Sequence, residues 1–208
     1  MKKLISYTLT ILLGLVLSSG SCRTDGFDTD PVDGVTINGV IWAKCNVSTS
    51  GNFTANPGDY GMLYQWNRKT AWSTTGPAGG SWDSSFPPAG WIAGNENCPF
   101  GWHTPTIGEF NSLLDNTKVK YELKTQNGSD GVLFTDLSTK KSVFFPFAGY
   151  RTEIGTLADV GFLCGYWSKT YHINNEVFLF TSTRFPTLIM DKFLCKTNYA
   201  ASIRCVKN

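Results

Sequence analysis

Charged residues are scarce in this sequence. Its 208 residues include 18 Lys and Arg and 16 Asp and Glu, so 16% are charged, against roughly 25% in an average globular protein. No long run of like charges occurs, and the formal net charge is only +2. This composition excludes a charged disordered tail and a coiled coil, and it argues against a nucleic-acid-binding protein.

Histidine is rarer still, and the motifs of known catalytic sites are missing. His103 and His172 are the only two, and no HExxH, Walker A, GxSxG or CxxC motif occurs. We expect His103 to pack or to cap beside Trp102, and Glu153 and Asp159 to hydrogen-bond the turn-like segment that holds them. The sequence therefore predicts a protein that is not an enzyme and that needs no metal and no other cofactor.

The first 33 residues indicate export. Lys2 and Lys3 precede an apolar run over 4–17 and then small residues, the order of a secretory signal peptide. Cys22 follows directly and resembles the lipidated Cys of a bacterial lipobox, so residues 1–21 are predicted to be the signal peptide. Residues 22–33 contain four Asp and are predicted to form an acidic tether. The alternative is ordinary secretion with Cys22 as a spare thiol.

Export permits disulfides, and five further cysteines are available for them. They are Cys45, Cys98, Cys164, Cys195 and Cys205. Five thiols allow two bridges with one thiol left over, and their spacing alone does not choose among the pairings.

Two segments carry strong local signals. Residues 34–43 place an Asn-Gly pair between two apolar runs, which predicts a β-hairpin. Residues 104–116 predict the one convincing helix, because Thr106 and Glu109 form a T-x-x-E capping box. Its apolar stripe consists of Ile107, Phe110, Leu113 and Leu114.

Between these segments, residues 46–101 show no clear periodicity. They are rich in Gly, Pro, Asn and Ser, and a structureless stretch of this length is unusual in a compact domain. The tryptophans of this region suggest that it packs on itself; they are Trp66, Trp72, Trp82, Trp91 and the flanking Trp102. We expect at most a short helical turn over 60–68.

After Thr117 the sequence predicts mainly strands. Candidate strands cover 119–124, 131–135 and 141–147, followed by the segments GYWSKTY, EVFLFTS, PTLIM and SIRCVK. The predicted class is α+β, with little helix, long loops and an antiparallel sheet.

Six motifs, in order, resemble the Fibrobacter succinogenes major paralogous domain. They are TINGVIWAKCNV, YGMLYQWNRKTAW, CPFGWHTPTIGEFNSLL, FPFAGYR, GFLCGYWSKT and SIRCVK, and they extend from Val35 to Lys207. The family is common in exported lipoproteins of Bacteroides-type bacteria, where similar acidic tethers occur. The resemblance implies a C-type lectin-like fold for a single domain at 34–208, with paired terminal strands, a small twisted sheet, one or two helices and long loops.

The resemblance also implies a pairing of the cysteines. The CPFGW and SIRCV elements should lie close together in that fold, so we expect a Cys98–Cys205 bridge. Cys164–Cys195 is then the expected second bridge, and Cys45 remains free.

Two activities of related folds do not carry over. Calcium-dependent lectins carry Glu-Pro-Asn or Gln-Pro-Asp together with Trp-Asn-Asp, and none of these occurs here. Formylglycine-generating enzymes use a Cys pair in a His- and Arg-rich setting, which Cys195 and Cys205 lack.

What the resemblance does imply is the location of a binding face, between Gly165 and Cys205. The predicted ligand-binding residues are Lys169, Tyr171, His172, Asn174, Asn175, Arg184, Phe185, Lys192, Asn198 and Tyr199. The alternative is that they form ordinary solvated loops.

These observations favour a surface-anchored lipoprotein that acts as a non-enzymatic binding or adhesion module for an unidentified protein or glycan. We expect it at the outer membrane or cell surface, in contact with the membrane through the lipid alone and without a nucleic-acid partner. The alternatives are a structural cell-envelope or fimbria-associated subunit and, less favoured, an exported enzyme on a formylglycine-generating-type scaffold. Loss of Lys2 and Lys3 with the signal leaves a mature chain of zero net charge, so recognition should depend on shape, stacking and local hydrogen bonds.

Overall fold

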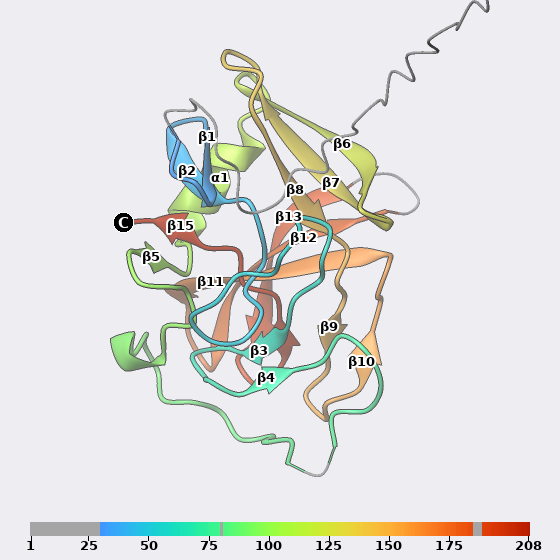
Figure 1. The fold of residues 1–208 in the computed structure, drawn as a ribbon. Helices are drawn as coiled ribbons and strands as arrows, with labels where there is room; N and C mark the ends of the chain where they lie inside the picture. Colours follow the sequence, from blue (N-terminus) through green and yellow to red (C-terminus); the bar gives the residue numbers. More distant parts are fainter. Residues whose placement is uncertain (1–29, 80, 185–188) are drawn as a thin grey trace, which may run out of the picture.

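The computed structural model describes residues 30–79, 81–184 and 189–208 (Figure 1). The predicted signal peptide, Cys22, the tether up to position 29 and Phe185 lie outside these ranges. The described chain forms antiparallel sheets and one short α-helix, which confirms the predicted mixture of strands with little helix. None of its helices is long and apolar enough to cross a membrane.

The two ends of the described chain meet in a four-stranded sheet. Its spatial order is β1 (Gly34–Ile37), β2 (Val40–Ala43), β15 (Val206–Lys207) and β5 (Trp102–His103). Asn38 and Gly39 join β1 to β2 with φ of 46° and 80°, the backbone that an Asn-Gly hairpin turn requires. The predicted hairpin is therefore confirmed, and Val206 lies opposite Trp42.

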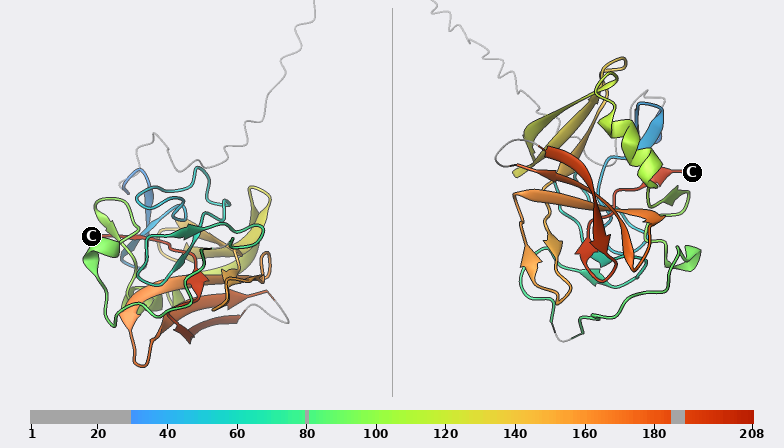
Figure 2. Two further views of the ribbon diagram at one scale, coloured as in Figure 1. Left: turned by 90° about the horizontal axis from the view of Figure 1, so that it is seen from below. Right: turned by 180° about the vertical axis from the view of Figure 1, so that it is seen from behind.

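The predicted helix is confirmed as α1 (Ile107–Leu114). Both halves of the capping box form: the Thr106 side chain accepts from the Glu109 N–H, and the Glu109 carboxylate accepts from the Thr106 N–H. Phe110 and Leu113 are buried on its inner face. Phe110 stacks on Phe180, with ring centroids 4.7 Å apart, and this contact fixes the helix against the sheets behind it (Figure 2).

Two three-stranded antiparallel sheets follow the helix. One contains β6 (Val119–Gln126), β7 (Ser129–Asp136) and β8 (Ser142–Pro146), and the other contains β11 (Leu163–Tyr171), β12 (Glu176–Thr183) and β13 (Ile189–Lys196). The three strands predicted over 119–147 are confirmed. Phe134, Phe145 and Phe180 from these sheets interlock in the main core at centroid distances of 5.2–6.2 Å.

A five-stranded sheet organises the loop-rich region. Its order is β10 (Leu157–Ala158), β9 (Tyr150–Arg151), β14 (Ala200–Ala201), β3 (Leu63–Gln65) and β4 (Ala71–Trp72), and a 3₁₀ turn covers Ala93–Asn95. The helical turn expected over 60–68 is wrong, because this segment contains β3. Leu63, Tyr64 and Gln65 are all buried, and pairing with β14 and β4 satisfies the buried backbone.

The strand predicted at PTLIM lies partly outside the described residues, and the strand found there extends further along the chain. The sequence predicts a strand at PTLIM, whereas β13 begins at Ile189 and continues to Lys196. Residues 191–196, expected to be irregular, instead form a continuous ladder with β12. Cross-strand hydrogen bonding decides this boundary, and the local residue types do not reveal it.

The Cys98–Cys205 disulfide is confirmed, with a Cα–Cα distance of 5.9 Å. The Cys164–Cys195 bridge is wrong, because both thiols are free. Cys164 lies opposite Ser182 and Cys195 lies opposite Val177, so β12 separates the two cysteines. Five residues along that strand amount to about 17 Å, far beyond the reach of a disulfide.

The expectation that Cys45 is free is also wrong. Cys45 is disulfide-bonded and buried at the end of β2. Spacing alone could not distinguish it from the other cysteines, because disulfide partners are neighbours in space and not in sequence.

Candidate functional site

Buried side-chain amides attach the loop at residues 82–85 to strands β3 and β14. The Gln65 Nε2 donates to the Asp83 carbonyl at 2.7 Å and to the Asn198 carbonyl at 2.8 Å. The Asn198 Nδ2 donates to the Ser84 carbonyl at 3.1 Å. Gln65 and Asn198 are both buried, so these bonds hold residues 82–85 against β3 and β14.

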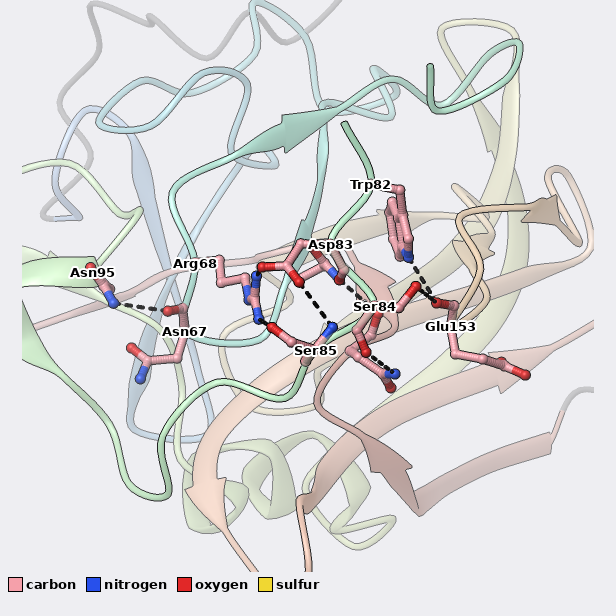
Figure 3. Close-up of polar contacts among 10 residues, drawn as sticks. Asn67, Arg68, Trp82, Asp83, Ser84, Ser85, Asn95 and Glu153 are labelled. Atoms are coloured by element: carbon pink, nitrogen blue, oxygen red, sulfur yellow. Dashed lines mark hydrogen bonds and ion pairs between the residues drawn. The ribbon is translucent and has the colours of Figure 1, made fainter. Parts of the chain in front are cut away.

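The same loop reaches the β9–β10 turn through Trp82 (Figure 3). The Trp82 Nε1 and the Ser84 hydroxyl both donate to the Glu153 carbonyl, at 2.8 and 3.2 Å. A side chain at Gly155 would come within 2.8 Å of the Trp82 ring, and the φ of Gly155 is +82°. Glycine is needed here because both the close contact and the positive φ exclude a larger residue.

An ion pair closes the outer side of the loop. Arg68 contacts the Asp83 carboxylate and donates to the Ser85 carbonyl at 2.9 Å (Figure 3). Hydrogen bonding to Ser85 and then to Arg68 lowers the pKa of Asp83 to about 2. The loop therefore carries a fixed negative charge that is already paired.

Asn67 holds the next loop segment. Its Nδ2 donates to the Gly90 carbonyl at 3.1 Å, its Oδ1 accepts from the Ile92 N–H at 3.2 Å, and its carbonyl accepts from the Asn95 side chain at 2.9 Å (Figure 3). Asn67 has a φ of 56°, which Asn tolerates better than most residues. One buried residue thus fixes both ends of the segment 90–95.

Beside this scaffold lies a pair of stacked tyrosines. Tyr150 and Tyr199 are 6.2 Å apart between ring centroids, at an interplanar angle of 25°. The Glu153 side chain, followed by burial, raises the pKa of Tyr199 to about 12. Burial, followed by Asp159, raises the pKa of Tyr150. Both phenols thus remain protonated donors at neutral pH.

The two carboxylates beside the tyrosines are solvent-exposed and have no Lys, Arg or His partner among the described residues. We call Trp82, Tyr150, Glu153, Asp159 and Tyr199 the tyrosine patch. Its aromatic faces and exposed carboxylates can stack and accept hydrogen bonds at the same time. The Glu153 carboxylate bonds its own backbone N–H, as expected of a residue that braces its turn, and it bonds the Tyr199 side chain as well.

A groove of about 650 Å³ adjoins the patch at Ile154, which is 72% exposed. Beneath it, the buried Arg151 donates to the carbonyls of Ser73, Gly76 and Gly155 at 2.7, 3.0 and 2.8 Å. The walls are mostly small or apolar and consist of Gly76, Pro77, Ala78, Gly79, Ile154, Gly155, Thr156 and Leu157. Arg151 therefore holds the two walls of the groove, residues 76–79 and 154–157, at a fixed distance.

The predicted binding residues do not converge on one surface. Asn198 and Tyr199 belong to the scaffold and the patch described above. A second group, Tyr171, His172, Asn174 and Asn175, forms the β11–β12 turn, where the Tyr171 hydroxyl accepts from the Asn175 N–H at 3.1 Å.

The remaining predicted residues lie elsewhere. Lys169 donates its N–H to the Pro105 carbonyl at 2.8 Å, and Lys192 binds the Asn111 side chain at 2.9 Å, so both lie beside α1. Arg184 is paired with Asp130 on β7.

Trp82 and Tyr150 were missed as site residues, and Glu153 and Asp159 were expected only to brace a turn. The strand pairing of β9 with β14 brings Tyr150 to Tyr199, and no local motif in the sequence marks that contact. Trp82 stands out only as a tryptophan in a loop.

A metal centre is not found among the described residues. No three His, Cys, Asp or Glu side chains come together to hold a metal ion there. The His103 Nε2 lies 3.0 Å from Glu109 and its Nδ1 lies 2.6 Å from Asn208, so its contacts tie the C-terminal residue to the start of α1.

The Fibrobacter succinogenes major domain family matches residues 22–207. The chain belongs to this family. The match covers nearly the whole chain and begins earlier than the motifs alone indicate. No curated protein and no solved structure matches the chain significantly.

Proposed function

We propose that this family member is a non-enzymatic binding module that recognises a protein or a glycan through the tyrosine patch. The observation that carries the proposal is the stacked Tyr150–Tyr199 pair, flanked by two exposed carboxylates without a cationic partner and held on a braced loop scaffold. Rigid aromatic side chains with polar ends offer a large contact area at a low entropic cost.

The C-type lectin-like fold is part of the same proposal. It is supported by the pairing of β2 with β15, the single α-helix, the long braced loops and the Cys98–Cys205 disulfide. Such a scaffold presents loops on a fixed framework, which suits recognition.

We also propose that the chain is exported and anchored at the outer membrane or cell surface by lipidated Cys22. The support is the order of charged, apolar and small residues over 1–21. Mass spectrometry of membrane-extracted protein should find an acylated N-terminal Cys22. An unmodified Cys22 in a secreted form would exclude the anchor, and so would a disulfide between Cys22 and Cys45, because lipidation uses the Cys22 sulfur.

Binding is tested by a glycan array together with a pull-down of envelope proteins. For any ligand found, Tyr199→Ala and Tyr150→Ala should each weaken binding about tenfold or more, because each removes an aromatic contact from the centre of the patch. Tyr121→Ala on β6 is the matched control, since Tyr121 is exposed and remote from the patch. Equal losses in all three variants would argue against the patch.

The second candidate function is a structural envelope subunit. One observation favours it: β13 is an edge strand whose Phe193 and Leu194 are 52% and 46% exposed. A long apolar edge invites pairing with another strand.

A further inference from the structure

The edge formed by β13 differs from the other strand edges of the molecule. β13 pairs with β12 on one side only, and it lies at the outer margin of the molecule (Figure 2). On the opposite side of the same sheet, β11 meets Gly149 and Ser202 through isolated bridges. The outward N–H and C=O groups of β13 therefore lack such cover within the described chain.

A comparison with β6 shows what an edge protected against association looks like. β6 is also an eight-residue edge strand, and Lys120, Glu122 and Lys124 occupy every second position along it. Charged side chains of this kind discourage pairing with another chain. β13 also carries charges, at Asp191, Lys192 and Lys196, but Phe193–Leu194–Cys195 forms an uninterrupted uncharged run between them.

We propose that β13 pairs with β13 of a second copy of this chain, antiparallel and about a two-fold axis through Phe193. A two-fold axis perpendicular to the sheet places the same face of both β13 strands on the same side of the combined sheet. Residues that lie opposite each other across the dimer must therefore come from the same face of the strand. Phe193, Asp191 and Cys195 share one face, because they lie opposite Leu179, Thr181 and Val177 of β12.

The charges on β13 select among the central registers. An axis at Lys192 would place two lysines directly opposite each other, and an axis at Leu194 would place Lys192 opposite Lys196 of the second copy. Like charges in opposite positions are destabilising. An axis at Phe193 places Phe193 against its own copy and Lys192 against Leu194, with no like charges opposite.

Dimerisation is tested by sedimentation of the full chain at concentrations up to about 0.1 mM. A Cys22→Ser background removes the proposed lipid anchor. The parent protein should dimerise, and Phe193→Lys should weaken the dimer at least about tenfold, since it removes the aromatic pair and opposes two ammonium groups. Tyr121→Lys on β6 is the matched control and should leave the dimer unchanged. Because Phe193 is half-exposed, an unchanged thermal midpoint should show that Phe193→Lys still folds.

The register is tested separately by oxidative cross-linking in a Cys195→Ser background. Phe193→Cys should form an intermolecular disulfide more readily than Leu194→Cys, because only position 193 faces its own copy. A monomer throughout the concentration range, or a dimer that survives Phe193→Lys, overturns the proposal. Preferred cross-linking at 194 overturns the register. Loss of glycan or protein binding at the tyrosine patch is a separate result and does not bear on this dimer.

Discussion

Residues 44–101 and residues 102–208 fold by different means. The second region, the strand half, builds most of its structure from strand ladders and one capped helix. The described part of the first region, the loop half, has two short strands and a 3₁₀ turn. The amide side chains of Asn46, Gln65, Asn67 and Asn97, all buried, bond its backbone carbonyls.

The difference shows how a long loop becomes part of a compact domain. Buried carbonyls need donors, and where no neighbouring strand supplies an N–H, a side-chain amide does so. Each such hydrogen bond contributes only about 1 kcal/mol net, whereas losing one leaves a buried group unsatisfied at about 1–3 kcal/mol. The loop half should therefore be sensitive to single polar substitutions that the strand half tolerates.

The largest loss of stability is expected when the disulfide between the loop half and the strand half is removed. Cys98 and Cys205 enclose a sequence separation of 107 residues, so Cys98→Ser/Cys205→Ser should lower the free energy of unfolding by roughly 3–5 kcal/mol. Denaturant titration measures the change. Cys195→Ser is the control, because this thiol is free, and it should cost less than about 1 kcal/mol. Similar losses in the two variants would mean that the disulfide does not stabilise the fold.

Arg151→Met should have an intermediate effect on the free energy of unfolding. It tests whether the loop half depends on single side-chain donors more than the strand half does. The substitution retains a long side chain but removes the donors to Ser73, Gly76 and Gly155. We expect a loss of about 2–4 kcal/mol. Hydrogen exchange should accelerate most in residues 73–79 and 152–157. Uniform acceleration over β6–β8 as well would contradict a role confined to the loop walls.

The smallest expected loss of stability occurs in the strand half and depends on pH. Burial tends to raise the pKa of Glu109, but contacts with His103 and Thr106 outweigh it and lower the pKa to about 2 from an ordinary 4.5. Glu109 in turn raises the pKa of His103 above its ordinary 6.5. The Glu109 carboxylate, with its lowered pKa, stabilises the fold above pH 4.5 and loses this effect as pH falls towards 2. The His103 imidazolium, with its raised pKa, contributes fully below pH 6.5 and loses its effect as pH rises through the folded pKa.

Glu109→Gln should therefore cost about 1 kcal/mol between pH 4.5 and 6.5 and less outside that window, after allowance for partial exposure. Thermal midpoints of parent and variant across pH 3–9 test this. His103→Gln should remove the dependence above pH 6.5 but retain part of the acid dependence, because Thr106 still contacts Glu109. A cost that does not vary with pH would contradict the ionic contact.

The sequence predicted those elements whose causes are local. The Asn-Gly turn at 38–39, the Thr106–Glu109 capping box and the strands on either side of residues 127–128 depend on neighbours a few residues away. β3 and β13 depend instead on partners distant in sequence. The family resemblance supplied the Cys98–Cys205 pair, which spacing alone leaves open.

The candidate site was less predictable for the same reason. The ten residues chosen from the C-terminal segment include Tyr199 but omit Tyr150, which only the β9–β14 pairing brings to it. The bracing amides look like ordinary loop residues in the sequence, because asparagine and glutamine are usually exposed. Their burial becomes visible only in the folded chain.

The two free thiols provide a chemical reporter of how the molecule opens. Cys164 is fully buried in the main core and Cys195 lies on the edge strand, and burial raises the pKa of each to about 12. A thiol reagent should therefore modify Cys164 only when the core opens as a whole. Local fraying of β13 should be enough to expose Cys195. The ratio of the two labelling rates separates detachment of one strand from unfolding of the entire domain, without any engineered cysteine.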